Sequence, residues 1–217
     1  MLAGRARLAG QLSVPAGARG LVVFVHGSGS GRHSPRNRYV AGVLQAAGLA
    51  TLLFDLLTAR EELDRANVFD VGLLAGRLTA VTGWARARPE CRELRVGYLG
   101  ASTGAAAALW AAAADPVVAA VVSRGGRPDL AAPRLEQVRA PTLLVVGGRD
   151  AVVLELNRRA QARMRCEVQL AVVAGATHLF EEPGTLEQAA ALARDWFVDH
   201  LGDHLAGHVV AAPQPAR

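Results

Sequence analysis

The chain has 217 residues, of which 51% are apolar, 20% charged and 5% aromatic. That length and composition suit one folded domain with a sizeable core, and they exclude a disordered, collagen-like or disulfide-stapled chain. All 24 basic residues are arginine, and they are scattered without interleaved aromatics, so the net charge of +5 does not indicate nucleic-acid binding.

Short apolar runs rich in β-branched residues alternate with longer helical patterns along the chain. One edge strand is expected within Arg5–Val14. Six inner strands are expected at Leu21–Val25, Ala50–Phe54, Leu94–Leu99, Val117–Val122, Thr142–Val146 and Val168–Val172. Nearly continuous apolar runs are typical of parallel strands that are covered on both faces. The alternation predicts an α/β fold with a central, mostly parallel sheet flanked by helices.

Helical patterns fill the intervals between these strands. The range Val68–Ala87 carries an apolar stripe at helical spacing, and Ala105–Ala114 is rich in alanine. The last helix is expected to open with a capping box formed by Thr185 and Gln188 and to end near His200.

The domain organisation is predicted to be simple. A single domain is expected over residues 1–201, followed by a loosely held tail over residues 202–217. No interval between strands is long enough for a large cap domain, although the loop Thr58–Ala66 is a candidate for a small lid.

The strongest motif is Gly100-Ala101-Ser102-Thr103-Gly104, a G-x-S-x-G sequence between a predicted strand and a predicted helix. A serine at such a sharp turn lies in strained backbone, and glycine on both sides removes clashes with the neighbouring strand and helix. The turn exposes the hydroxyl, and the helix N-terminus offers N–H groups to a developing oxyanion. Ser102 is therefore the candidate nucleophile.

Two further residues complete the pattern of a catalytic triad. Asp150 and His178 each follow a predicted strand, so both are expected at the same edge of the sheet as Ser102. The order serine, aspartate, histidine is that of the α/β hydrolases. The alternatives are that Asp150 only caps the next helix and that His178 is a surface histidine.

A glycine-rich loop, His26-Gly27-Ser28-Gly29-Ser30-Gly31, follows the first inner strand. It is a candidate oxyanion loop, in which the N–H of Ser28 or Gly29 joins that of Thr103 while His26 is structural. A competing hypothesis is that this loop begins a dinucleotide-binding unit in which Asp55 is the carboxylate that binds the ribose. Against it, the expected sixth glycine is Arg32, and Asp55 lies too far along the chain.

Other polar residues are weaker candidates. Arg124 follows a strand on the predicted active edge; it is a candidate for binding a substrate carboxylate, but pairing with an acid such as Asp129 is favoured. Glu181 and Glu182 are expected in a solvated turn. No metal or cofactor is expected from the spacing of His, Cys, Asp and Glu residues.

Taken together, these motifs resemble the α/β-hydrolase superfamily, and specifically small enzymes of the dienelactone hydrolase type, over roughly Leu21 to His200. The resemblance implies an α/β-hydrolase fold in which Ser102, Asp150 and His178 serve as nucleophile, orienting acid and base. Dienelactone hydrolases proper carry a cysteine nucleophile where this chain has Ser102, so dienelactone itself is not implied as the substrate. The segment from Arg32 to Asn37 is similar to a subgroup found beside, or fused to, phosphoribosyltransferase domains.

The hypothesis from the sequence is a serine hydrolase that cleaves a small ester, lactone or thioester through an acyl-enzyme. The alternative is a non-catalytic or weakly active accessory domain that partners a phosphoribosyltransferase. The protein is expected to bind a small acyl substrate and neither nucleic acid nor a membrane. Whether it forms a homodimer is left open. No apolar run reaches the roughly 18 residues of a membrane span and no secretory signal is recognised. Because Cys91 and Cys166 are isolated in sequence, we expect a reduced, cytoplasmic protein.

Overall fold

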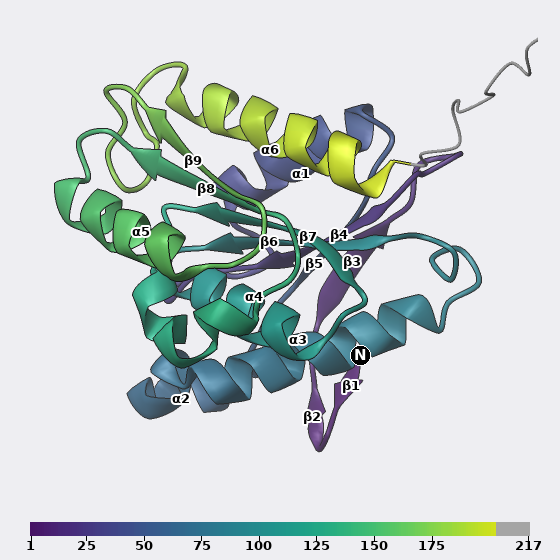
Figure 1. Ribbon diagram of the computed structural model, residues 1–217. Helices are drawn as coiled ribbons and strands as arrows, with labels where there is room; N and C mark the ends of the chain where they lie inside the picture. Colours follow the sequence, from purple (N-terminus) through teal and green to yellow (C-terminus); the bar gives the residue numbers. More distant parts are fainter. Residues whose placement is uncertain (203–217) are drawn as a thin grey trace, which may run out of the picture.

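A seven-stranded sheet forms the centre of the computed structural model, which describes residues 1–202 (Figure 1). Its strands lie in the order β3 (Gly10–Ser13), β5 (Ala50–Phe54), β4 (Leu21–Val25), β6 (Val96–Ala101), β7 (Val118–Arg124), β8 (Thr142–Gly147) and β9 (Val168–Val173). β3 pairs antiparallel with β5, and every other neighbouring pair in this sheet is parallel. The mostly parallel sheet predicted from the apolar runs is confirmed.

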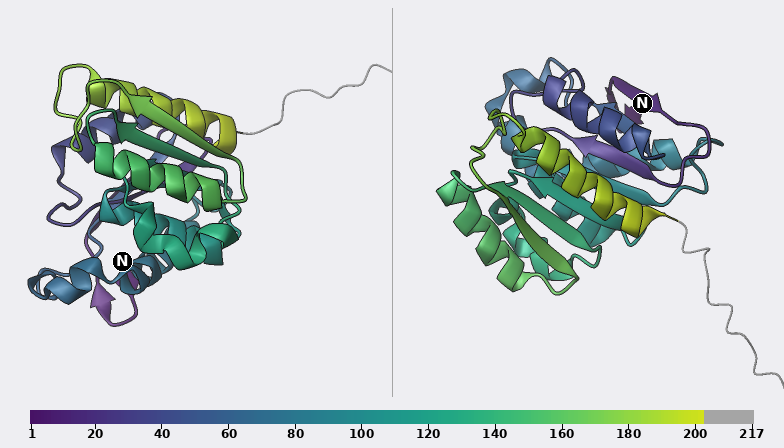
Figure 2. Two further views of the ribbon diagram at one scale, coloured as in Figure 1. Left: turned by 60° about the vertical axis from the view of Figure 1, so that its left-hand side comes forward. Right: turned by 90° about the horizontal axis from the view of Figure 1, so that it is seen from above.

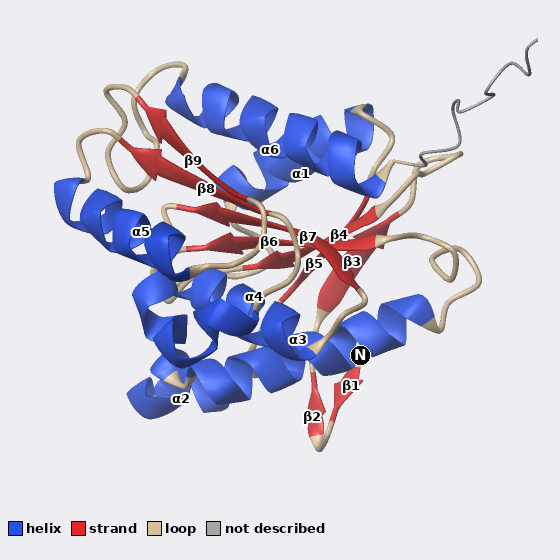
Figure 3. Ribbon diagram, viewed as in Figure 1, coloured by secondary structure: helices blue, strands red, loops and turns tan. Residues whose placement is uncertain are grey.

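Helices cover both faces of the sheet (Figures 2 and 3). One face carries α1 (Pro35–Ala46) and α6 (Thr185–Leu201); the other carries α3 (Val71–Arg86), α4 (Thr103–Ala114), α5 (Ala151–Arg163) and the 3-10 segment η2 (Pro128–Gln137). Successive side chains of a strand point to opposite faces, so in β4 Val22 and Phe24 pack toward α1 and α6 while Val23 and Val25 pack toward α4. This double burial explains the unbroken apolar run.

The order of the strands places a crevice at the carboxyl ends of β4 and β6. From β4 the chain moves to β5 on one side of the sheet and later to β6 on the other side. Loops that leave neighbouring strands in opposite directions open a crevice between them, where open α/β sheets bind their ligands. Here the two loops are the glycine-rich loop after β4 and the serine turn after β6.

The N-terminal segment is more broken than the sequence predicts. The expected edge strand Arg5–Val14 divides into β2 (Ala6–Arg7), which pairs with β1 (Leu2–Ala3) in a separate hairpin, and β3. Gly4, at φ +61°, makes the turn of that hairpin. Only β3 joins the main sheet, at its edge.

The helix expected over Val68–Ala87 is interrupted at Asp70. A short α2 (Arg65–Phe69) precedes α3, and the Asp70 carboxylate accepts a hydrogen bond from the N–H of Leu73 at 2.9 Å. An N-cap aspartate begins a new helix because it satisfies one of the free N–H groups of the first turn.

The predicted lid segment, Thr58–Ala66, folds against α3 as helical turns that include η1 (Glu61–Leu63). Glu61 accepts hydrogen bonds from Thr58 and pairs with Arg77 of α3 at 2.6 Å. Thr58 and Arg77 together lower the pKa of Glu61. Within residues 1–202 there is no insertion large enough for a cap domain, and no helix is long and apolar enough to cross a membrane.

The capping box expected at the start of α6 is wrong. Gly184, at φ +81°, is the N-cap residue, and Thr185 is already inside the helix. The Thr185 hydroxyl donates instead to the carbonyl of Glu182 at 2.7 Å. The predicted tail over residues 202–217 lies, apart from Gly202, outside the described residues.

Candidate active site

Ser102 lies at the turn from β6 into α4 with φ +50° and ψ −122°. A positive φ at a residue other than glycine is strained and persists only where the surrounding structure enforces it. A Cβ at Gly100 would lie 2.4 Å from the Cα of Ala105, and one at Gly104 would lie 2.2 Å from the carbonyl oxygen of Val25. Both glycines therefore permit the close approach that presents the serine hydroxyl, as the motif predicts.

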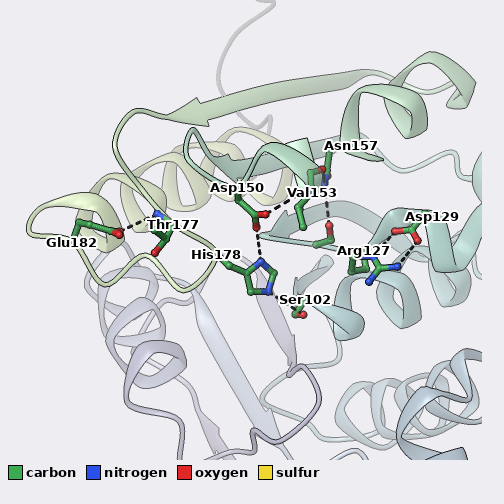
Figure 4. Close-up of polar contacts among 10 residues, drawn as sticks. Ser102, Arg127, Asp129, Asp150, Val153, Asn157, Thr177, His178 and Glu182 are labelled. Carbon is green, nitrogen blue, oxygen red and sulfur yellow. Dashed lines mark hydrogen bonds and ion pairs between the residues drawn. The ribbon is translucent and has the colours of Figure 1, made fainter. Parts of the chain in front are cut away.

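The structure brings Ser102, Asp150 and His178 together at the carboxyl edge of the sheet (Figure 4). His178 Nδ1 lies 2.6 Å from Asp150 Oδ2, and His178 Nε2 lies 3.3 Å from Ser102 Oγ. Asp150 follows β8 and His178 follows β9, while Ser102 follows β6. A base between a hydroxyl and a carboxylate is the arrangement that activates a serine nucleophile.

Asp150 makes both of the contacts that the two sequence interpretations require, one to the histidine and one to the next helix. One carboxylate oxygen contacts the imidazole, and the other is 3.5 Å from the N–H of Val153 in the first turn of α5. Only 15% of the Asp150 side chain is exposed, against 37% for His178. The cap fixes the carboxylate relative to α5, so the histidine meets an acid whose position is held by the helix.

The loop that carries His178 is anchored by Glu182, a residue expected in a solvated turn. Its carboxylate accepts a hydrogen bond from the N–H of Thr177 at 3.0 Å, and this bond lowers the pKa of Glu182. Glu182 is therefore ionised at neutral pH and holds the backbone next to the histidine. No motif marks this residue, because the contact depends on how the loop folds back.

Replacing Glu182 by alanine should lower kcat/KM about tenfold with little loss of stability, because His178 loses its fixed position but the exposed loop tolerates the change. The comparison is ester hydrolysis by Glu182→Ala and by Glu187→Ala, which truncates an exposed glutamate in the first turn of α6. Equal rates for the two variants would contradict the anchoring role.

The glycine-rich loop after β4 is held by His26. Its Nε2 accepts the N–H of Leu56 at 3.0 Å, which leaves Nδ1 to donate to the carbonyl of Gly27 at 2.9 Å. The N–H of Ser28, expected to face the oxyanion, donates instead to Oγ1 of Thr103 at 2.9 Å. This corrects the predicted set of donors: the Ser28 amide is engaged, whereas Thr103 and Gly29 remain candidates.

Two cavities border this loop. The larger, of about 540 Å³, is lined by Ser102 and His178 together with the loop and the first turn of α1. The smaller, of about 320 Å³, lies toward α3 and is lined on one side by four apolar residues, Leu56, Leu57, Val68 and Leu74. The site thus has a polar compartment and a more apolar one, and the glycine-rich loop lines both.

Arg124, at the end of β7, lines the larger cavity and is 8% exposed. Its Nη2 donates to Oδ1 of Asn37 at 2.7 Å. The pairing with Asp129 favoured from the sequence is wrong, because Asp129 makes a two-pronged ion pair with Arg127 at 2.7–2.8 Å. Arg127 follows two glycines that turn the chain away from β7 toward η2, so it, and not Arg124, reaches that acid.

The residues on which the competing dinucleotide hypothesis depends make contacts with each other. Asp55 accepts the backbone N–H of Arg32 at 2.8 Å and forms an ion pair with its side chain. Its carboxylate thus ties the glycine-rich loop to the end of β5.

Comparison with known proteins places these features in a family. Residues 12–204 match the profile of the Dienelactone hydrolase family. The chain belongs to the dienelactone hydrolase family. It therefore has the α/β-hydrolase fold.

Individual relatives agree with this assignment. A solved dienelactone hydrolase of Anabaena variabilis is 55% identical, with a TM-score of 0.89, and the match covers 92% of this chain and 95% of that one. An α/β serine hydrolase homologue from Coxiella burnetii is 21% identical, with a TM-score of 0.77 over 90% of this chain and 94% of that one, and it supports the fold alone.

The curated relatives are longer proteins. Two from strains of Mycobacterium tuberculosis are 68% identical over 203 residues, which is 93% of this chain but 46% of theirs. Both carry the provisional name phosphoribosyl transferase. The chain thus spans about half the length of the curated relatives that it matches.

Proposed function

We propose that this protein hydrolyses a small carboxylic ester, lactone or thioester through a Ser102 acyl-enzyme. The observation that carries the proposal is the continuous line of contacts from Asp150 through His178 to Ser102, at a strained turn that opens into a cavity. Family membership supports hydrolysis of an ester bond, and the serine supplies the nucleophile that this chemistry needs.

In the proposed reaction, Ser102 Oγ attacks the substrate carbonyl while His178 Nε2 takes its proton. Asp150 accepts the Nδ1–H bond and stabilises the imidazolium. The imidazolium then donates its proton to the departing alkoxide or thiolate, which leaves an acyl-Ser102 ester. A water molecule, deprotonated by His178, attacks that ester, and the acid product departs as Ser102 regains its proton.

The negative charge on the carbonyl oxygen needs donors fixed in advance. We assign the N–H of Thr103, at the start of α4, and the N–H of Gly29 to this role. The apolar compartment suits one arm of the ester, and the polar compartment beside Arg124 suits the other.

The proposal predicts a burst of p-nitrophenol when the protein is mixed with p-nitrophenyl acetate, because acylation releases the phenol before water removes the acyl group. The burst amplitude should equal the concentration of active sites. Ser102→Ala should show neither burst nor turnover above the uncatalysed rate. Turnover that survives in this variant would overturn the assignment of the nucleophile.

A second candidate function rests on the curated relatives, which are about twice as long and are named for phosphoribosyl transfer. In this alternative the chain is an accessory domain of a phosphoribosyl transferase. It would be favoured if the protein lacked esterase activity but co-eluted on gel filtration with a phosphoribosyl transferase from the same genome. Three further expectations from the sequence stay predictions. The protein is expected to bind neither nucleic acid nor a membrane, it is a candidate homodimer, and its expected location is the cytoplasm.

A further inference from the structure

The larger cavity beside Ser102 is lined by two arginines, Arg36 and Arg124, and by no acidic residue among those that the structure describes. His178 is the third ionisable residue of this lining. Arg36 makes only an exposed ion pair with Glu181, at 3.3 Å. Since exposed pairs are weak, Glu181 offsets little of the positive charge of Arg36.

Arg124 is the most unusual of these groups. Among residues 1–202 its Nη1 is buried without a hydrogen-bond partner, and its Nη2 contacts only the neutral amide of Asn37. Burial, with a smaller contribution from Arg36, lowers the pKa of Arg124 to about 10, so the group stays charged at neutral pH. Buried cations are normally paired, which indicates that an anion completes this site.

The first turn of α1 borders the same cavity. Ser34, Pro35, Arg36 and Asn37 all line it, and α1 has twelve residues. Pro35 has no N–H and the N–H of Asn37 donates to Ser34 Oγ at 3.4 Å, so the N–H of Arg36 and the helix dipole are what this helix end offers to an anion. Arg124 and the helix end therefore both line one compartment, from two different elements of the fold.

We propose that this compartment binds a phosphate monoester carried by the substrate, between Arg124 and the first turn of α1. The inference rests on the proposed function, because it names the group that one arm of the ester carries. A phosphate monoester has a charge near −2 at pH 7 and three terminal oxygens. Its charge can balance the positive charges of both guanidinium groups, and its three oxygens can accept hydrogen bonds from several directions. A carboxylate offers only one charge and two oxygens.

The first test compares three acetate esters of similar size: 2-acetoxyethyl phosphate, 3-acetoxypropanoate and neutral 2-acetoxyethanol. The wild-type protein is expected to hydrolyse the phosphate ester with a kcat/KM roughly 10- to 100-fold above that of the neutral ester, since charge-assisted hydrogen bonds are strong. Equal values for the phosphate and neutral esters, or a preference for the carboxylate ester, would overturn the proposal.

The second test changes the arginine. Arg124→Gln is expected to lower kcat/KM for the phosphate ester at least tenfold more than kcat/KM for the neutral ester, which removes the preference between the two. A merely structural role would instead lower kcat/KM for all three esters equally. The matched control is Arg88→Gln, which removes one charge from an exposed pair with Glu90 outside the cavity and should keep the preference.

The third test does not depend on hydrolysis. Binding of inorganic phosphate is measured by isothermal titration calorimetry on Ser102→Ala and on the double variant Ser102→Ala, Arg124→Gln. Binding only to the first supports the compartment even if no ester is hydrolysed, in which case the proposed function alone fails. Hydrolysis of all three esters without phosphate binding would refute the compartment and leave the hydrolase standing.

Discussion

Replacing His178 by alanine is expected to reduce kcat/KM for ester hydrolysis by roughly 10⁴-fold or more. Without the imidazole, the Ser102 hydroxyl loses the base that lies 3.3 Å away, and the hydroxyl itself is a weak nucleophile. The residual rate should reflect only binding and the oxyanion donors. Steady-state kinetics with p-nitrophenyl acetate give the ratio directly.

The double variant Ser102→Ala, His178→Ala sharpens this test. Because the two residues act as one unit, the double loss should not exceed that of either single variant. The control is His200→Ala on α6, whose ring contacts the Trp196 carbonyl and Glu167 away from the site. Losses that multiply in the double variant would show that Ser102 and His178 act separately.

Gly104→Ala is expected to have the largest effect on stability of any single methyl group added near the site. The new Cβ would lie 2.2 Å from the carbonyl oxygen of Val25 and 2.4 Å from that of His26. These atoms belong to the end of the central strand β4 and the loop after it, so the clash cannot be relieved by rotating a side chain. We expect a loss of at least about 3 kcal/mol in the free energy of unfolding, measured by urea denaturation.

A matched control for this substitution lies in α3. Gly83 is exposed in the helix interior, and a Cβ there meets nothing within 4 Å. Gly83→Ala should therefore raise stability by about 0.5–1 kcal/mol, because alanine favours the helix. If Gly104→Ala were as stable and active as the native protein, the account of the serine turn would be wrong.

The arrangement of the site could be predicted from the sequence because parallel strands end at one edge of a sheet. Ser102, Asp150 and His178 each follow an apolar run, so their common edge is fixed once those runs are recognised as parallel strands. Glycine at positions 100 and 104 carries a similar signal, since close backbone contact excludes a side chain.

Contacts between distant side chains gave no such signal. Arg124 meets Asn37, 87 residues away, and the Ser28 amide meets the Thr103 hydroxyl, 75 residues away. Such pairings depend on the relative positions of packed elements and leave no periodic pattern in the chain. The hydrogen bond between Glu182 and Thr177 gave no signal for the same reason, because it exists only in the folded loop.

The central claim is that Ser102 is an activated nucleophile. The most direct measurement is labelling with a fluorophosphonate probe, followed by mass-spectrometric mapping of the adduct in the native protein, in Ser102→Ala and in His178→Ala. The account predicts one adduct, on Ser102, that disappears in the first variant and forms far more slowly in the second. Folded native protein that remains unlabelled, or that carries the adduct on another residue, would contradict it.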